Sequence, residues 1–257
     1  MHARLFFAPT TMTMKPEVIQ PTASDFGRYV YCGAKLFLDK STALESFRKA
    51  KYSSYDIGRK TISRFYGKQN EHKCIEWVIK RHKQPQNILF NGTGKDNKQH
   101  FSAKINPFDV TLQCRPDLII MRSRQIVLYE FKSVGDANYL WYSEYDSVHA
   151  QVWCYSFIEH FKFDKYYLFR YYVDPFKRGA FPKESELTKE NLSGEKFTPL
   201  FEKYLNVIEI LNNANRASKK EFKLDLTKLN RPVNQPDKCH HCLYYCLYCT
   251  PECEPIR

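Results

Sequence analysis

The stretch from Cys114 to Val134, CRPDLIIMRSRQIVLYEFKSV, holds two short apolar runs with a polar turn between them. The runs, Leu118 to Met121 and Ile126 to Phe131, are rich in branched and aromatic residues, as is typical of strands. The segment between them, Arg122 to Gln125, has the length of a hairpin turn. The stretch therefore predicts an antiparallel β-hairpin, and the rest of the chain is interpreted around it.

The register of this hairpin decides which charged side chains meet. Side chains alternate between the two faces of a strand, so Glu130 and Lys132 point the same way. If the turn is centred between Ser123 and Arg124, Asp117 lies directly opposite Glu130. Ser-Arg is not a favoured two-residue hairpin pair. A three-residue loop would instead place the two acids on opposite faces.

Two carboxylates that face each other favour a bound cation. Directly opposed β-carbons lie roughly 5 Å apart, and like charges at that distance destabilise a sheet. Mg²⁺ and similar hard cations take oxygen ligands and keep waters and phosphates in their shell. The residue types therefore predict a metal site at Asp117 and Glu130, with the ammonium group of Lys132 placed to orient a water. The competing interpretation is a surface hairpin that ends in ordinary charges.

The pattern Pro116-Asp117 followed by Glu130-Phe131-Lys132 resembles the signature of the PD-(D/E)XK nucleases. In that family the Asp and Glu bind the metal and the Lys assists the attacking water. The resemblance therefore implies catalytic roles for Asp117, Glu130 and Lys132, with Mg²⁺ or Mn²⁺ as the metal. It also implies an α/β fold of the restriction-endonuclease-like type, in which helices flank a mixed central sheet.

A helix predicted from Ser147 to Phe163 adds to the resemblance. Its residues Gln151 and Tyr155 are four apart and share a face. The pair matches the Gln-x-x-x-Tyr motif that follows the catalytic hairpin in RecB-like nucleases. The match implies that Gln151 and Tyr155 bind DNA and help to organise the site.

A second helix, predicted from Thr61 to Arg81, is the candidate source of another metal ligand. RecB-like nucleases carry a metal-binding His in a Gly-x-x-x-His element on such a helix. The nearest match here is His72, although Gly67 precedes it by one residue too many. Glu71 is the rival ligand, and a solvent-facing histidine is the third interpretation.

Cysteines crowd the C-terminus, where five of the nine lie between Cys239 and Cys253. Thiolates bind zinc or iron-sulfur clusters. A self-contained zinc site would use Cys239, Cys242, Cys246 and Cys249, but three residues separate the two pairs, whereas zinc modules usually leave a longer loop. A cluster that takes its fourth ligand from elsewhere in the chain is therefore favoured. Cys32 is the candidate, in a predicted N-terminal helix that Ser24 would cap.

This arrangement of one N-terminal and three C-terminal cysteines around the nuclease pattern is similar to that of the iron-sulfur RecB-like nucleases, including the CRISPR-associated RecB-like exonucleases. The similarity spans Ser24 to Cys253. It implies a 4Fe-4S cluster, with Zn²⁺ as the less favoured alternative. The implied ligands are Cys32, Cys239, Cys242 and Cys249, with Cys246 as the alternate, and Cys253 could also serve.

The remaining elements are predicted from the periodicity of apolar residues and from turn-forming residues. Residues 84–99 form a polar loop, and Phe101 to Gln113 forms one or two strands that lead into the hairpin and bring the sheet to at least three strands. Further along, the sequence predicts a strand from Lys165 to Val173, a polar loop that contains Pro175 and Pro182, and an amphipathic helix from Thr198 to Ala217.

Composition bounds the partners and the compartment. The net charge of +12 and pI near 9.2 favour a polyanionic partner. The sequence has no run of about 18 apolar residues, so no membrane span is expected. The cysteines are odd in number and clustered, which favours metal-bound thiolates in a reducing, cytoplasmic location over a disulfide scaffold. We expect a flexible lead-in at 1–21, a nuclease domain at 22–235 and a Cys-rich tail at 236–257.

These observations together predict a metal-dependent DNA exonuclease of the RecB-like iron-sulfur type, which acts on single strands or frayed ends. Its setting would be CRISPR spacer acquisition or DNA recombination and repair, with a CRISPR integrase or recombination proteins as partners. Two alternatives remain open. One is a catalytically silent adaptor that binds DNA ends, and the other is a zinc-dependent nucleic-acid-binding module.

Overall fold

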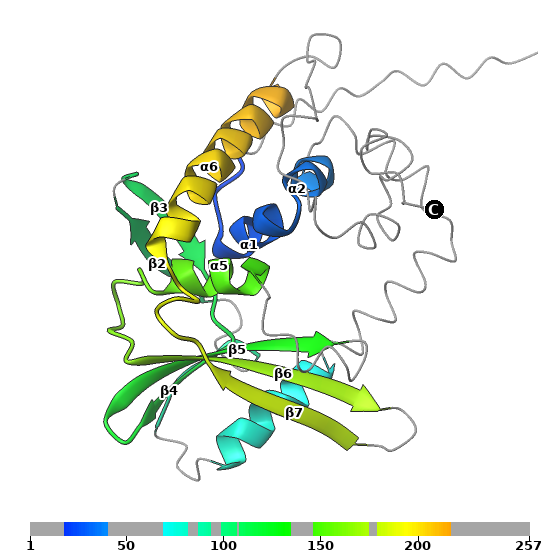
Figure 1. Ribbon diagram of the computed structural model, residues 1–257, viewed down its shortest axis with the longest axis vertical. Helices are drawn as coiled ribbons and strands as arrows, with labels where there is room; N and C mark the ends of the chain where they lie inside the picture. The colour runs from blue at the N-terminus through cyan, green and yellow to red at the C-terminus, as the bar shows by residue number, and fades with distance from the viewer. Residues whose placement is uncertain are drawn as a thin grey trace, which may run out of the picture.

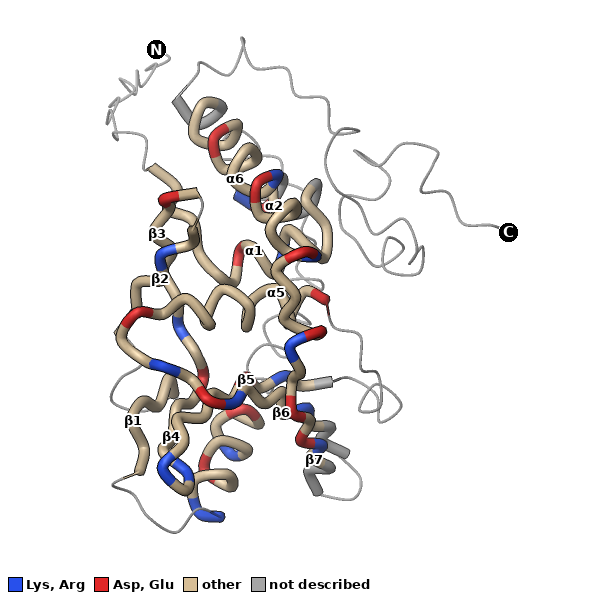
Figure 2. The backbone as a smooth tube through the Cα atoms, turned by 60° about the vertical axis from the view of Figure 1, so that its left-hand side comes forward, with Lys and Arg blue, Asp and Glu red and all other residues tan. Residues whose placement is uncertain are grey.

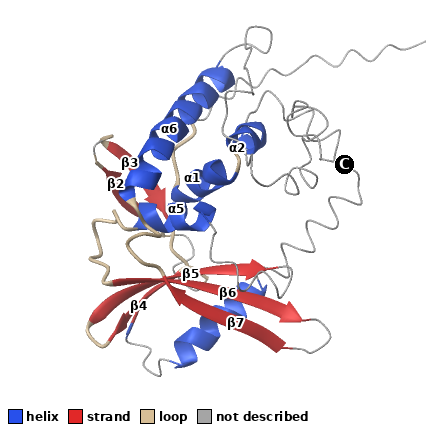
Figure 3. Ribbon diagram, viewed as in Figure 1, coloured by secondary structure: helices blue, strands red, loops and turns tan. Residues whose placement is uncertain are grey.

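The computed structural model describes residues 18–40, 69–81, 87–93, 99–106, 108–134, 146–174 and 179–216. Within them, a mixed five-stranded sheet lies between helices on its two faces (Figure 1). One face carries α5 (Asp146–Tyr155), with α1 (Ala23–Tyr31), α2 (Gly33–Lys40) and α6 (Gly194–Arg216) beyond it, and the other carries a helix at 69–81 (Figure 3). The expectation of a mixed sheet flanked by helices is therefore confirmed.

The five strands follow one another in space in the order β1, β4, β5, β6, β7. Neighbouring strands are antiparallel except β5 and β6, which run parallel because the chain crosses over through α5 between them. Their bounds are Ile88–Asn91 (β1), Leu118–Arg122 (β4), Gln125–Val134 (β5), Lys165–Asp174 (β6) and Gly179–Glu186 (β7).

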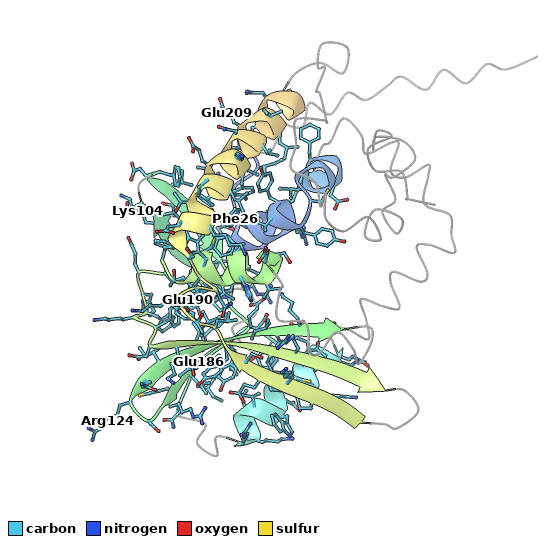
Figure 4. All side chains as sticks on the ribbon, in the orientation of Figure 1. Phe26, Lys104, Arg124, Glu186, Glu190 and Glu209 are labelled. Atoms are coloured by element: carbon cyan, nitrogen blue, oxygen red, sulfur yellow. The ribbon has the colours of Figure 1, made fainter. Side chains whose placement is uncertain are left out.

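The central hairpin of β4 and β5 has the predicted register. Arg122 pairs with Gln125, and Leu118 pairs with Tyr129. The two turn residues, Ser123 and Arg124, have φ values of 50° and 67°. A two-residue type I′ turn requires positive φ at both central positions. The hairpin thus forms on a turn pair that local preference disfavours, and Figure 4 shows Arg124 pointing away from the sheet at its tip.

The hairpin forms because both of its faces are buried. On one face, Leu128 joins the core built with α1, α5 and α6, where Phe26 lies among the helices (Figure 4). On the other face, Val127, Tyr129 and Phe131 join a second core with the helix at 69–81. Burial on both sides explains the nearly continuous apolar run of β5. The free energy of this burial outweighs the turn penalty, since each large side chain contributes roughly 1.5–3 kcal/mol.

Three predictions about strands are wrong. The segment from Phe101 to Gln113 does not extend the central sheet: β2 (Phe101–Ile105) and β3 (Val110–Cys114) form a separate two-stranded sheet. Strand β1 takes that place from within the region expected to be a polar loop. Strand β7 runs through Pro182, where a loop was expected. Pro182 is tolerated because β7 is an edge strand, where a missing N–H leaves no ladder bond unmade.

Helix boundaries also differ from prediction. Thr22, rather than Ser24, caps α1, and its side chain accepts a hydrogen bond from Asp25 N at 3.0 Å. Cys32 has extended backbone angles and separates α1 from α2, so it lies at a helix junction instead of inside one helix. Helix α5 ends at Tyr155, before the expected Phe163. Part of the helix expected from Thr61 lies outside the described residues.

A close helix crossing holds α5 against the N-terminal segment. A Cβ atom at Gly27 of α1 would lie 2.5 Å from the carbonyl oxygen of Ser147 in α5. Only glycine allows the two backbones to approach so closely. The crossing fixes the position of α5 over the sheet. None of the helices in the described ranges is long and apolar enough to cross a bilayer.

Candidate active site

The two acids of the hairpin lie where β4 begins and β5 passes the centre of the sheet. Asp117 immediately precedes β4, and its Oδ2 accepts a hydrogen bond from Phe131 N at 2.7 Å. The same register places Asp117 opposite Glu130. Glu130 is buried, with 1% of its surface exposed. The sequence prediction that these two carboxylates face each other is therefore confirmed.

One oxygen of Glu130 is well satisfied and the other is not. Oε1 accepts from Lys132 Nζ at 2.5 Å and from Gln151 Nε2 at 2.9 Å. Oε2 is buried and has no hydrogen-bond partner among the described residues. A buried polar atom without a partner typically costs about 1–3 kcal/mol, and more when it is charged. Among the described residues, this oxygen therefore lacks the partner that a buried charge needs.

The acids and the lysine shift one another's pKa values. Burial, and then the negative charge of Asp117, raises the pKa of Glu130 to about 8, against the opposing effect of Lys132. Burial also raises the pKa of Asp117. For Lys132, burial works to lower the pKa, but Glu130 and Asp117 outweigh it and raise the pKa. Lys132 therefore carries its proton at neutral pH, while the two acids resist being ionised together.

These features fit a hard divalent cation. Positive charge between Asp117 and Glu130 would offset their repulsion and give Glu130 Oε2 a partner. No cluster of three or more His, Cys, Asp or Glu side chains suited to a metal occurs among the described residues. Of the described residues, Asp117 and Glu130 would be the ligands, and water or phosphate could complete the shell. That is how Mg²⁺ is usually bound, because it keeps several waters.

Helix α5 closes the site with a short chain of hydrogen bonds. The amide group of Gln151 donates to Glu130 and also to the hydroxyl oxygen of Tyr155. The Tyr155 hydroxyl in turn donates to the carbonyl oxygen of Arg115 at 3.0 Å. Tyr155 is fully buried. The two predicted helix residues are thus brought to the acids, where they orient Glu130 and tie α5 to the segment before Asp117.

The two rival ligands from the helix at 69–81 lie differently. His72 is half exposed, with Nδ1 3.2 Å from Thr93 Oγ1 and Nε2 3.2 Å from Glu76 Oε1. Glu71 is near enough to the acids that its charge adds to the increase in the pKa of both Glu130 and Lys132. The charge of Glu71 therefore reaches the acids, whereas His72 contacts Thr93, the residue after Gly92.

Gly92 supports the site, although it lies in the stretch at 84–99 that the sequence predicts to be a polar loop. Its N–H donates to the carbonyl oxygen of Asp117 at 2.8 Å, and its own carbonyl oxygen accepts from the Arg115 guanidinium at 2.8 Å. A Cβ atom at Gly92 would lie 2.8 Å from the carbonyl oxygen of Pro116. The Asn91-Gly92 pair signalled a turn, but nothing in its local sequence pointed to Asp117.

The predicted cluster ligands are described only in part. Cys32 is buried at the junction of α1 and α2. The tail residues Cys239, Cys242, Cys246, Cys249 and Cys253 lie outside the described residues, as does most of the expected lead-in at 1–21. The cluster and the domain boundaries remain predictions.

Comparison with known proteins does not assign a family to this site. No protein-family model matches the chain, and no curated protein matches it. Among solved structures, the chain is similar to one titled "Crystal structure of SSO0001", with 13% sequence identity and a TM-score of 0.45. That alignment covers 95% of this chain and 91% of the other. A likeness at this level does not assign a function to the chain.

Proposed function

We propose that the protein is a metal-dependent nuclease of the PD-(D/E)XK type, which hydrolyses phosphodiester bonds in DNA. The observation that carries the proposal is the buried Glu130, with Asp117 opposite it and its Oε2 without a partner. A scaffold protein gains nothing from two opposed, partly desolvated acids, because their repulsion and burial destabilise the fold. A nuclease gains a place for a divalent cation beside a phosphate.

The residues of the site have distinct roles in this proposal. Asp117 and Glu130 would hold Mg²⁺ or Mn²⁺, which when bound supplies positive charge to the scissile phosphate and lowers the pKa of water. Lys132 keeps its proton because its pKa is raised, so it donates a hydrogen bond that orients the attacking water and does not act as a base. Gln151 fixes the Glu130 carboxylate through its amide.

The more specific proposal is a RecB-like exonuclease for single strands or frayed ends. It rests on the Gln151 and Tyr155 pair, on the net charge of +12 and on the cysteine pattern. A 4Fe-4S cluster would join Cys32 to the tail and couple metal binding to folding, with Zn²⁺ as the alternative. CRISPR spacer acquisition and recombination, with an integrase or recombination proteins as partners, remain the proposed settings.

A silent adaptor for DNA ends is the second candidate. It shares the basic charge but needs no catalytic lysine. The complete set of Asp117, Glu130 and Lys132, with Gln151 hydrogen-bonded to it, favours the nuclease.

The test is cleavage of end-labelled single- and double-stranded DNA with Mn²⁺, Mg²⁺ or chelator, on anaerobically purified protein. We expect metal-dependent cutting by the wild type and none by Glu130→Gln, which keeps the size of the side chain. Mn²⁺ should also raise the melting temperature of the wild type but not of this variant, because a ligand that binds only the folded state stabilises it. DNA binding without cutting under every metal would refute the nuclease and leave the adaptor.

A further inference from the structure

Three cationic residues form one row across adjacent strands of the sheet. Lys132 of β5 pairs with Arg170 of β6, and Arg170 pairs with Lys183 of β7. Paired residues on neighbouring strands point to the same face. That face is the one that carries Glu130, because Glu130 and Lys132 are two residues apart on β5. The row therefore lies next to the two acids, displaced by two residues, or roughly 7 Å, along the strands.

Arg170 is the fixed centre of this row. It is 2% exposed, and its guanidinium donates to Ser185 Oγ of β7 at 2.6 Å. Arginine keeps its charge even when buried, and a buried charge is screened by solvent less than an exposed one. The hydrogen bond joins β6 to β7 on this face. Arg170 thus supplies a permanent positive charge between Lys132 and Lys183.

The acidic residues of β7 are engaged on the opposite face. Glu184 accepts from the Tyr129 hydroxyl at 3.0 Å and pairs with Arg81 at 3.3 Å. Glu186 pairs with Lys165 at 3.2 Å and accepts from the Tyr167 hydroxyl at 3.1 Å. Alternation along β7 therefore separates the charges, with Lys183 on the face of the acids and both glutamates on the other. Figure 2 shows residues of both signs gathered where these strands lie side by side.

We propose that Lys132 and Lys183, with the buried positive charge of Arg170 between them, hold a backbone phosphate of the nucleic acid next to the bond that is cut. The inference rests on the proposed nuclease function, because it takes the scissile phosphate to lie at Asp117 and Glu130. The row spans two strand spacings, roughly 10 Å, which suits one or two phosphates of a single strand. It would direct the strand away from the acids toward β7. Because the contacts are to phosphate, the row contributes affinity without sequence preference.

The test is binding of a fluorescent single-stranded oligonucleotide in EDTA at several salt concentrations, which requires no cleavage. Lys183→Gln should weaken binding several-fold and reduce the slope of log affinity against log salt by about 0.7, the value for one phosphate contact on a single strand. Lys183→Arg should restore both. The matched control is Lys165→Gln, which removes the same charge from the opposite face of the sheet and should leave the slope unchanged.

A second arm places an uncharged methylphosphonate at successive positions of the oligonucleotide. One position should weaken binding by the wild type but not weaken binding by Lys183→Gln any further, because the variant has already lost that contact. If the wild type binds and cuts DNA but Lys183→Gln leaves the salt slope unchanged, the proposed phosphate contact is wrong and the proposed nuclease function stands. If Lys183→Gln reduces the salt slope but the wild type never cuts DNA, the phosphate contact is supported and the nuclease function is refuted. A wild type that neither binds nor cuts overturns both.

Discussion

The β2–β3 and β4–β5 hairpins each carry a lysine paired with a carboxylate, and the pairs behave differently. In the β2–β3 hairpin, Lys104 lies 2.7 Å from Asp109, and their side chains are 48% and 82% exposed. In the β4–β5 hairpin, Lys132 lies against Glu130, and their side chains are 34% and 1% exposed. The pKa of Asp109 is lowered by its hydrogen bond to Lys104, whereas the pKa of Glu130 is raised.

Burial and a second acid account for this difference. The exposed pair stabilises its hairpin little, because water screens it. The buried pair loses hydration that one lysine cannot replace, and Asp117 adds repulsion. The first hairpin is therefore what an ordinary sheet looks like, with alternate residues buried and charges outside. The second carries an electrostatic cost that a site for a cation and a phosphate explains.

The largest effect is expected when the lysine of each pair is removed in turn. Lys132→Ala should reduce cleavage by at least about 100-fold, because it removes a charged donor aimed at the reacting groups. DNA binding should weaken no more than several-fold, as in Lys183→Gln, since most of the basic residues remain. The measurement is the single-turnover rate with Mn²⁺, beside an anisotropy titration.

Lys104→Ala is the matched control, since it removes the lysine of the exposed pair. It should cut DNA at the wild-type rate. Equal rates for wild type and Lys132→Ala would remove the lysine from the mechanism and make the two hairpins equivalent.

The register of the β4–β5 hairpin could be predicted because two signals agreed. The apolar runs set the length of the turn, and alternation then placed Asp117 opposite Glu130. The turn residues argued against this register, yet the hairpin has positive φ at both Ser123 and Arg124. Burial on two faces was the stronger signal, and its strength is visible in the sequence of β5.

The neighbours of the hairpin could not be predicted in the same way. Strand β1 is four residues long and lies in a polar region, so no periodicity marks it. Strand β7 contains Pro182 and three charged residues, and it is a strand only because β6 offers it an edge. The strands β2 and β3 have ordinary strand sequences, but pairing partners depend on the path of the chain and not on strand propensity.

The arrangement of the candidate residues could be predicted where they are close in sequence, and not where it depends on the orientation of a helix. Asp117, Glu130 and Lys132 follow from one hairpin, and Gln151 with Tyr155 from one helical spacing. The choice between Glu71 and His72 depends on how the helix at 69–81 is rotated against the sheet. Packing of Cys74, Ile75 and Val78 fixes that rotation, and one residue along a helix turns a side chain by roughly 100°.

A smaller effect is expected from Gly92, which holds the start of β4 in place. Gly92→Ala would put a Cβ atom 2.8 Å from the carbonyl oxygen of Pro116 and 3.1 Å from that of Asp117. Its φ is not positive, so the cost is steric: we expect unfolding free energy to fall by about 1–3 kcal/mol. Affinity for Mn²⁺ should fall as well, because Asp117 is displaced. Urea unfolding and a Mn²⁺ titration measure the two effects.

Gly194→Ala is the control for Gly92. A Cβ atom there would meet only Thr198 Oγ1 at 3.9 Å, so neither stability nor Mn²⁺ affinity should decrease. If Gly92→Ala destabilised the fold without changing Mn²⁺ affinity, the backbone contact would serve the fold alone, and its link to the acids would be wrong.

The smallest effect on cleavage is expected from Tyr155→Phe at the site, compared with Tyr204→Phe in the core. Tyr155→Phe removes the hydroxyl that links Gln151 to the carbonyl oxygen of Arg115, and Tyr204→Phe removes one that donates to the carbonyl oxygen of Thr22. Each variant should lose about 1–2 kcal/mol of unfolding free energy, since each removes a hydroxyl that makes two partly buried hydrogen bonds. Only Tyr155→Phe should also slow cleavage, by several-fold, because Gln151 is then freer to turn away from Glu130. Equal cleavage by both variants would mean that the Gln151 amide is held without Tyr155, and that the burial of Glu130 alone distinguishes the two hairpins.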